Sequence, residues 1–449
     1  MAGVLLSEDL RLAASPETAD VILVNTCAFI EDARTEAAQA ILRACRHKAA
    51  GGCRAVIVAG CLPQRYRGRM AATFPDVDAF LGVDELARIG AIVRQVAAGR
   101  RGIVAVGAQP PKRLFRPPLP GLRFSGGPFA YLKVAEGCNH ACAFCAIPGI
   151  RGRYRSRGVA ELVAEAQALL ASGVREINLI SQDTTSYGQD RRRAVGAPPA
   201  LPVLLRALDQ MDGDFWIRIL YGYPSRVTDA LLEVMAASRH VCAYLDLPIQ
   251  HSHPDILRAM RRADTVRAVA ELPQRLRRAV PGIVLRTTCL VGFPGETEAH
   301  FRHLLAYVEA AQFDHLGVFA FSPEEGTAAF KRGKVPLPEV AAERRDRLLR
   351  LQRLIVNERR RVLKGTMAQA LLLAGPGTRK PQAGIRRPGP GNQDPESGIR
   401  WVARLSRQAP EVDGMTYVRG VPPSAKAGEF VPVRITGGRG YDLAAEAAE

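Results

Sequence analysis

Six short apolar runs between residues 130 and 321 constrain the fold more than any other feature of this chain. Stretches with helical spacing of apolar residues, such as Ala160–Ala171 and Thr228–Ser238, lie between most of them. Repeated strand–helix units predict a parallel sheet, here an open barrel of six βα units in an α/β protein. The predicted strands are Ala130–Val134, Glu176–Ile180, Trp216–Leu220, Ala243–Leu247, Val284–Val291 and Leu316–Phe321.

Polar and glycine-rich segments follow most of these predicted strands. Barrel enzymes keep their active sites at the rim where the carboxyl ends of the strands meet, so we expect the functional residues there. The segments are Ser181–Asp183, Tyr221–Pro224, Pro248–His251, Gly292–Glu296 and Ser322–Gly326.

A CxxxCxxC run follows the first predicted strand. Its thiols belong to Cys138, Cys142 and Cys145. Three thiolates in eight residues can hold three corners of a 4Fe-4S cluster and leave one iron open to bind and reduce S-adenosylmethionine. The aromatic Phe144 directly before the last cysteine is typical of the radical S-adenosylmethionine (SAM) pattern. We therefore predict that the three cysteines form a catalytic metal site.

The cysteine run has two other interpretations, a structural zinc site and a disulfide knot. A structural zinc site needs a fourth ligand, which His140 could supply. A disulfide knot is disfavoured, because the chain shows no secretory signal and its other cysteines are scattered. The spacing favours the radical cluster, and we expect a reducing, cytoplasmic environment.

The first hundred residues predict a separate small α/β domain. Strands are expected at Asp20–Asn25, Arg54–Ala59 and Ala79–Val83, and a helix at Glu31–His47. Cys27 and Cys61 each directly follow a predicted strand, where open α/β sheets place their binding crevice.

The carboxy-terminal part predicts a small β-barrel. Its strand patterns include Met415–Arg419 and Phe430–Thr436, and the Gly/Pro-rich stretch Gly375–Gly398 predicts a mobile loop. A Pro/Gly/Arg-rich linker is expected over about Ala108–Gly127. The predicted domains are thus residues 1–107, 124–355 and 356–449.

Two segments are candidate cofactor walls. Gly292 and Gly295 would let the backbone approach a ligand, and Glu296 would accept hydrogen bonds from an adenosine or cap the next helix. Gln182 and Asp183 would hold the methionine part of SAM, with an ordinary loop and helix cap as the alternative.

The remaining candidates carry weaker signals. Cys45, Cys53, Cys242 and Cys289 lack ligand spacing and are expected to be buried small hydrophobes. His251 and His253 flank Ser252 and are expected to be rim contacts, although histidine more often serves as a satisfied polar group.

Charge and hydropathy limit the partners. The net charge of +18 favours contact with RNA, but an arginine-rich proteome would produce the same excess. The helix Ala341–Lys364 is rich in arginine. We expect its arginines to form a solvated face, an interpretation slightly favoured over a dedicated binding surface. No apolar run of about 18 residues is present, so no membrane span is predicted.

These motifs together resemble those of the radical SAM methylthiotransferases along nearly the whole chain. Val24–Cys27 and Gly60-Cys61 are similar to two of the three cysteine motifs that hold a second 4Fe-4S cluster in that family. Cys138, Cys142 and Cys145 match the radical cluster. The last domain is similar to the TRAM module, a substrate-recognition barrel.

Within the family, the chain most resembles the ribosomal-protein aspartate methylthiotransferases (the RimO branch). The segments that carry this resemblance are Leu247–His251, Ser322–Thr327, Ala409–Gly414 and Tyr441–Leu443. Residues Ala444–Glu446 after the last of these segments make a looser ending than the family's usual glycine-containing one.

The resemblance implies both a reaction and its partners. A deoxyadenosyl radical would take hydrogen from the β-carbon of an aspartate on small-subunit ribosomal protein twelve, and the second cluster would carry the sulfur that is methylated and joined there. The cofactor must supply the reactivity, because an unactivated C–H bond yields neither to acid–base chemistry nor to a nucleophile. The implied partners are that protein, the ribosome or RNA, and an electron donor such as flavodoxin or ferredoxin.

The sequence departs from the family pattern at its start. It begins after the position of the family's first cluster cysteine, so only Cys27 and Cys61 of that triad are present. We expect a truncated or misassigned start; for the chain as given, sulfur insertion is in doubt. The alternatives are a tRNA adenosine methylthiotransferase and, in another class, a catalytically incomplete ribosome- or RNA-binding protein.

Overall fold

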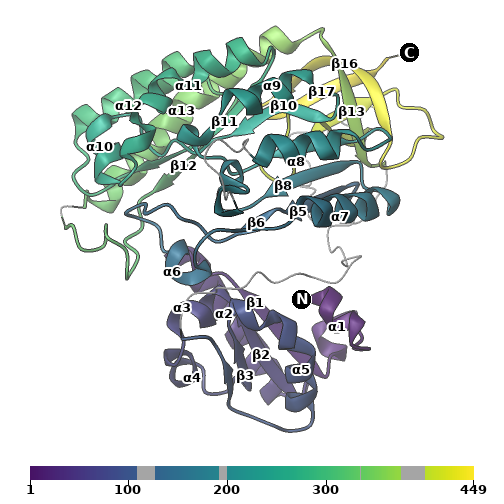
Figure 1. Cartoon of the computed structure of the whole chain (residues 1–449), viewed down its shortest axis with the longest axis vertical. Coiled ribbons are helices and arrows are strands. Elements are labelled where there is room, and N and C mark those ends of the chain that lie inside the picture. Colours follow the sequence, from purple (N-terminus) through teal and green to yellow (C-terminus); the bar gives the residue numbers. More distant parts are fainter. Residues whose placement is uncertain (109–126, 192–199, 334, 376–399, 449) are drawn as a thin grey trace. The chain divides into compact units, whose positions relative to one another are not determined.

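The computed structural model describes residues 1–108, 127–191, 200–333, 335–375 and 400–448. The chain divides into two units, each built from several segments of the sequence (Figure 1). The first unit comprises Met1–Leu122, Ala135–Arg157 and Ser322–Gly333. The second comprises Arg123–Val134, Gly158–Phe321 and Lys334–Glu449.

A four-stranded parallel sheet forms the centre of the first unit, with strand order β1-β2-β3-β4. Its strands are β1 (Val21–Thr26), β2 (Ala55–Gly60), β3 (Ala79–Leu81) and β4 (Ile103–Ala105). Its main helices are α1 (Ala2–Ser7), α2 (Glu31–Ala49), α3 (Cys61–Tyr66), α4 (Arg69–Thr73) and α5 (Ile89–Ala97). The small α/β domain expected from the sequence is confirmed.

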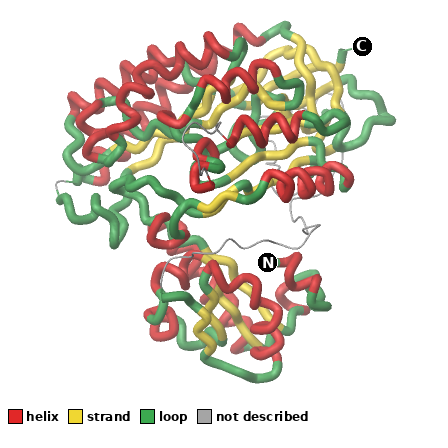
Figure 2. Tube along the Cα trace, in the orientation of Figure 1, coloured by secondary structure: helices red, strands yellow, loops and turns green. Residues whose placement is uncertain are grey.

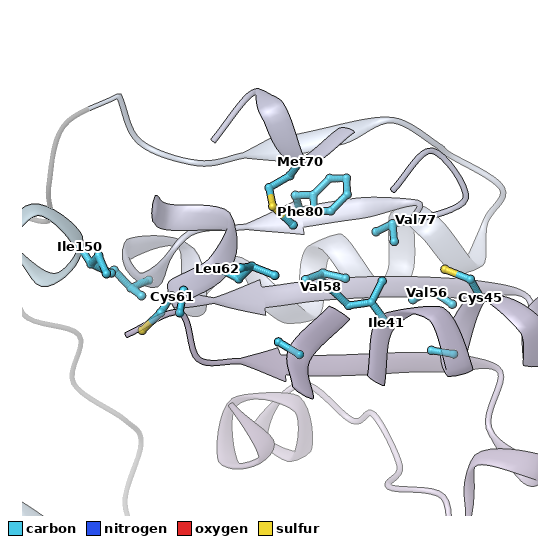
Figure 3. Packing of buried hydrophobic residues seen from close by; sticks show 14 of the residues in the cluster. Ile41, Cys45, Val56, Val58, Cys61, Leu62, Met70, Val77, Phe80 and Ile150 are labelled. Carbon is cyan, nitrogen blue, oxygen red and sulfur yellow. The ribbon is translucent and has the colours of Figure 1, made fainter. Parts of the chain in front are cut away.

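The central strand β2 is buried on both faces, which explains its uninterrupted apolar sequence. Val56 and Val58 pack with Ile41 of α2 and Phe80 of β3 on one face (Figure 3). Ile57 packs with α5 on the other face. Strand β1 lies at an edge of the sheet in the described part of the chain, and most of its apolar side chains are only partly buried.

The second unit contains a six-stranded parallel sheet in the order β12-β11-β10-β9-β8-β5. Its strands are β5 (Phe129–Lys133), β8 (Glu176–Ile180), β9 (Trp216–Ile219), β10 (Val241–Asp246), β11 (Val284–Val291) and β12 (His315–Ala320). The helices are α7 (Val159–Ala171), α8 (Ala200–Asp209), α9 (Asp229–Ala237), α10 (Pro254–Ala259), α11 (Val266–Ala279), α12 (Glu298–Ala311) and α13 (Pro338–Leu363). Helices run along the outside of the strands (Figure 2), so the predicted open six-unit βα barrel is confirmed.

A closed five-stranded barrel completes the second unit. Its strands, in order around the barrel, are β13 (Met367–Ala374), β14 (Trp401–Leu405), β15 (Thr416–Arg419), β17 (Asp442–Ala447) and β16 (Phe430–Arg439). Leu372, Val418 and Ile435 are among its buried interior residues. The predicted β-barrel is therefore confirmed, whereas the predicted mobile loop and linker fall almost wholly outside the described residues.

Helix α13 differs in part from its expected solvated character. Arg344 is buried against Phe301 of α12, and Arg359 pairs with Asp314, with 2.8 Å between Nε and Oδ1. Arg353 and Arg361 are exposed as expected. One side of this arginine-rich helix thus packs against the second unit. Among the described residues, no helix is long and apolar enough to cross a membrane.

Candidate active site

The CxxxCxxC run lies on a loop that belongs to the first unit. Strands β6 (Ala135–Glu136) and β7 (Arg155–Ser156) pair antiparallel and close the base of the loop. The amide N of Cys138 donates to Gly152 O over 3.1 Å. Gly137 has φ +83°, and a Cβ there would lie 2.2 Å from Arg153 O, so only glycine fits this close approach.

Backbone amides also hold the cysteines themselves. The amide N of His140 lies 3.4 Å from Cys138 Sγ, and Cys145 N donates to Cys142 O over 3.1 Å, closing a tight turn. Cys138 is buried, whereas Cys142 and Cys145 are partly exposed. An amide directed at sulfur favours the thiolate, the form that binds metal. The donor set therefore fits an iron–sulfur cluster with one iron left open for SAM.

The helix after the cysteines packs into the core of the first unit. Ile150 of α6 (Ile147–Arg151) joins the same buried cluster as Cys61 and Leu62 of α3 (Figure 3). The loop that carries the cysteine run and the helix that begins at Cys61 are thus parts of one packed structure.

Cys27 and Cys61 leave the same edge of the amino-terminal sheet. Thr26 of β1 is the register partner of Gly60 of β2, and each cysteine follows directly. Gly60 has φ +108°, and a Cβ there would lie 2.7 Å from Thr26 O. Neither thiol is in a disulfide; Cys27 is exposed and Cys61 buried. Burial raises the pKa of Cys61, and the nearby Cys27 raises it further.

Arg151, at the end of α6, binds Cys61 and was not predicted. Its Nη2 lies 3.0 Å from Cys61 Sγ, and its Nη1 donates to Glu136 Oε1 over 3.1 Å. The guanidinium lowers the pKa of Cys61 in opposition to burial. It also links the segment after the cysteine run to Cys61. The sequence does not single it out, because Arg153, Arg155 and Arg157 follow Arg151 within six residues.

Glu324 was predicted only as part of a polar rim segment, and it has a definite structural role in the first unit. Its Oε2 accepts from Arg65 Nη1 over 2.9 Å and also pairs with Arg34, and its Oε1 accepts from Ser322 over 2.7 Å. Arg65 also donates to Ala28 O over 2.7 Å. Glu324 therefore ties together the segments that follow Cys27 and Cys61.

Glu296 lies in the second unit and holds its own loop. Its Oε2 accepts from the amides of Gly292 and Phe293. Thr297 caps α12 by accepting from His300 N, so the alternative that Glu296 caps this helix is wrong. Gly292 packs against Ala341, whose Cβ would lie 2.6 Å from an added Cβ, whereas the space beside Gly295 is open.

Two buried polar atoms near this loop have no hydrogen-bond partner. They are Glu296 Oε1 and His251 Nε2, which lie 3.8 Å apart, too far for a hydrogen bond. His251 Nδ1 accepts from His253 N over 2.9 Å, and burial lowers the pKa of His251 despite the adjacent carboxylate. An unpartnered donor and acceptor beside the carboxyl ends of β10 and β11 fit a polar ligand.

Asp183 makes hydrogen bonds within its own loop. Its carboxylate accepts from the amide of Ser186 over 3.2 Å and from Thr185 Oγ1 over 2.5 Å, capping the 3-10 helix Thr184–Ser186. This matches the alternative of a loop and helix cap. Gln182 is half-buried, and a role for either residue toward SAM stays a prediction.

Three family models match the chain. The Radical SAM superfamily matches residues 132–308, the uncharacterized protein family UPF0004 matches residues 1–82, and the TRAM domain matches residues 393–448. Proteins named ribosomal protein uS12 methylthiotransferase RimO from Syntrophus aciditrophicus and Geobacter sulfurreducens are each 40% identical over 99% of this chain and 94% of their own length. The chain belongs to the radical SAM methylthiotransferase family.

Solved structures agree with this fold. The radical SAM methyltransferase TsrM from Kitasatospora setae, with cobalamin and a [4Fe-4S] cluster bound, matches with a TM-score of 0.51 and 16% identity. The match covers 73% of this chain and 65% of that one. Family membership makes this protein a radical SAM enzyme that uses SAM and a 4Fe-4S cluster. The matched region contains Cys138, Cys142 and Cys145.

Proposed function

We propose that this enzyme methylthiolates the β-carbon of an aspartate on small-subunit ribosomal protein uS12. The observation that carries the proposal is the identity of about 40% to proteins named for that reaction, over essentially the whole chain. Leu247–His251 and Ala409–Gly414 are among the segments through which the sequence resembles that branch of the family.

The chain's own residues have separable roles in this proposal. Cys138, Cys142 and Cys145 hold the radical cluster, while Gly137 fixes the loop and the amide of His140 is directed at Cys138 Sγ. When bound, the cluster and SAM supply the electron and the radical that an unactivated C–H bond requires. His251 and Glu296 offer a buried donor and acceptor to polar groups of SAM.

A second cluster is part of the proposal. Cys27 and Cys61 would hold it, and Arg151 would favour the thiolate of Cys61 in opposition to burial. The electron donor is proposed to be a flavodoxin or ferredoxin, and the site of action the cytoplasm, where ribosomes are assembled.

A tRNA methylthiotransferase is the second candidate. The net charge of +18 favours an RNA substrate or a ribosomal contact. Gln250-His251 and the Tyr441–Leu443 ending disfavour it. A catalytically incomplete ribosome- or RNA-binding protein is the third candidate, because helix α13 is rich in arginine.

Iron content and substrate mass separate these candidates. Anaerobically reconstituted protein should hold about eight irons with two clusters and about four with the radical cluster alone. Cys138→Ala should lose about four irons and deoxyadenosine formation, while Cys53→Ala, a buried thiol outside both sites, should retain them.

Mass spectrometry of uS12 and of tRNA from a deletion strain assigns the substrate. The proposal expects uS12 to lose the mass of one methylthio group and the tRNA to remain unchanged. Loss of a tRNA modification with unchanged uS12 would reject it. Unchanged uS12 and tRNA would favour the binding protein.

A further inference from the structure

Three histidines and an aspartate meet at the beginnings of helices α10 and α12 in the second unit. The ring centroids of His253 and His300 lie 4.3 Å apart, and those of His253 and His303 lie 5.0 Å apart. Ligand atoms of His253, Asp255 and His300 all lie within 4.8 Å of one another. In the part of the chain that the structure describes, this is the one group of three potential ligands that converge so closely.

The four side chains arrive as two short pairs. His253 and Asp255 are two residues apart around the start of α10, and His300 and His303 are three apart on one face of α12. Imidazole and carboxylate are ligands that zinc and similar divalent metals accept in tetrahedral sites. His253, Asp255 and His300 converge, and His303 is the candidate fourth ligand, with its ring 5.0 Å from that of His253 and its Nδ1 2.9 Å from Ser252 Oγ.

The charges around the site also suit a cation. A neutral imidazole is the form that binds metal. Asp255 adds a negative charge: its Oδ1 accepts from Arg258 over 2.6 Å, while its Oδ2 lies 3.9 Å from His253 Nδ1.

Metal binding would compete with existing hydrogen bonds. Nδ1 of His253 accepts from Asp255 N, and Nδ1 of His300 accepts from Thr297 N, each over 3.2 Å. A metal bound at Nε2 would move the ring proton to Nδ1, and one bound at Nδ1 would displace the amide. Either way these helix caps are lost, so we expect weaker binding than at a site that has no such competition.

We propose that His253, Asp255, His300 and His303 form a binding site for a divalent transition metal of the zinc class. The bound ion would join the start of α10 to the start of α12. These helices directly follow the loops that carry His251 and Glu296, the residues with unpartnered buried atoms. The site contains no cysteine.

Cobalt is the probe for this site, because thiolate ligands give Co²⁺ a strong near-ultraviolet charge-transfer band that imidazole and carboxylate do not. Full-length protein with reconstituted clusters is titrated anaerobically with Co²⁺. We expect one equivalent to bind with visible bands and without the thiolate band, and Zn²⁺ to displace it. Binding that occurs only with the thiolate band overturns the proposal.

Two variants and a control locate the bound ion. His303→Ala leaves both helix caps in place and should weaken binding, and His300→Ala combined with His303→Ala should abolish it. His47→Ala, in the first unit, should bind as the unaltered protein does. Zn²⁺ should raise the melting temperature of the unaltered protein and not that of the double variant. Cobalt binding that is unchanged in the double variant would reject the site.

Discussion

At the residue scale, the proposed second cysteine site depends on an opposition between burial and one positive charge. Cys61 is buried, which raises the pKa of its thiol, and Arg151 opposes this effect through a contact of 3.0 Å. A cation beside a buried thiol favours the thiolate, so Arg151 limits the rise in the pKa of Cys61 without cancelling it. Arg151 is therefore a positioning residue that acts through Cys61.

Replacing Arg151 should make Cys61 less reactive. In Arg151→Gln the pKa of Cys61 should rise further, so less thiolate is present at pH 8 and alkylation slows by up to about tenfold for each unit of pKa. The rate is measured on cluster-free protein with iodoacetamide and peptide mass spectrometry across a pH series. Arg151→Lys should restore part of the rate, and Cys53, which Arg151 does not contact, should react as before. Equal rates at Cys61 in all three proteins would exclude this role.

Asp246 provides a second test at this scale through the pH dependence of stability. Burial raises its pKa from 3.8 to about 6, although Arg286 lies 3.7 Å from its Oδ1. The native state therefore binds this proton more tightly than the unfolded state does, and stability falls as pH rises from about 4 to about 6.

Asp246→Asn should remove this pH-dependent loss. Between pH 5 and pH 7.5, the free energy of unfolding of the variant relative to the unaltered protein should improve by about 1 kcal/mol. Urea denaturation at the two pH values measures the change. A difference that does not depend on pH would show that the carboxyl titrates normally.

At the element scale, the segments after Cys27 and Cys61 are held by a loop from far along the chain. Glu324 pairs with Arg34 of α2 and Arg65 of α3, and its side chain is 2% exposed. Burial raises the pKa of Glu324, but the hydrogen bonds from Ser322, Arg65 and Arg34 lower it overall. The ionised carboxylate is thus the form that stabilises this arrangement.

Glu324→Gln should loosen these elements. It leaves two guanidinium groups without their anion and should cost about 2–3 kcal/mol, below the about 3–5 expected for a fully buried pair because Arg34 is partly exposed. Amide hydrogen exchange should increase at residues 28–34. Glu325→Gln is the matched control, because its 3.5 Å pair with Arg69 is exposed at the surface and should contribute little. Similar effects of the two changes would contradict the proposed role.

Elements were predictable where a local pattern determines them. The run Val284–Val291 coincides with β11, because apolar residues at both ends and β-branched threonines between them suit a mostly buried parallel strand. The barrel strand β17 (Asp442–Ala447) was not predicted, because it is short, polar in part and held by pairing with distant strands. The Val83 end of the third strand was wrong, since a 3-10 helix begins there.

Residues of the candidate site were likewise predictable only where a local sequence pattern identifies them. Cys138, Cys142 and Cys145 are recognisable because all three ligands and their spacing lie within eight residues of sequence. Arg151 and Glu324 were missed as contact residues because their partners lie 90 and 259 positions away, at Cys61 and Arg65, and no spacing rule relates them. Thr297 caps helix α12 in place of Glu296, because the Glu296 carboxylate accepts hydrogen bonds from the amides of Gly292 and Phe293 in the preceding turn.

At the scale of the whole molecule, buried charges join the open sheet to the small barrel within the second unit. Glu176 of β8 accepts from Arg218 Nε of β9 over 2.8 Å and also pairs with Arg404 of β14, and all three side chains are fully buried. Arg218 also donates to Ser406 O over 2.6 Å. The two arginines outweigh the effect of burial and keep the pKa of Glu176 low.

Glu176→Gln should destabilise the sheet and the barrel together. Removing the one anion leaves two buried guanidinium groups unpaired, which should cost about 3–5 kcal/mol. Urea unfolding followed by hydrogen exchange should show β8 and β14 losing protection in one transition at a lower urea concentration. Glu233 lies on the exposed face of α9, so Glu233→Gln should leave the urea concentration of the transition unchanged. If β14 kept its protection while β8 lost it, the barrel would be stable without this network.

Replacing all three charged residues by methionine or leucine should lower the free energy of unfolding less than Glu176→Gln does, because no buried charge then remains unpaired.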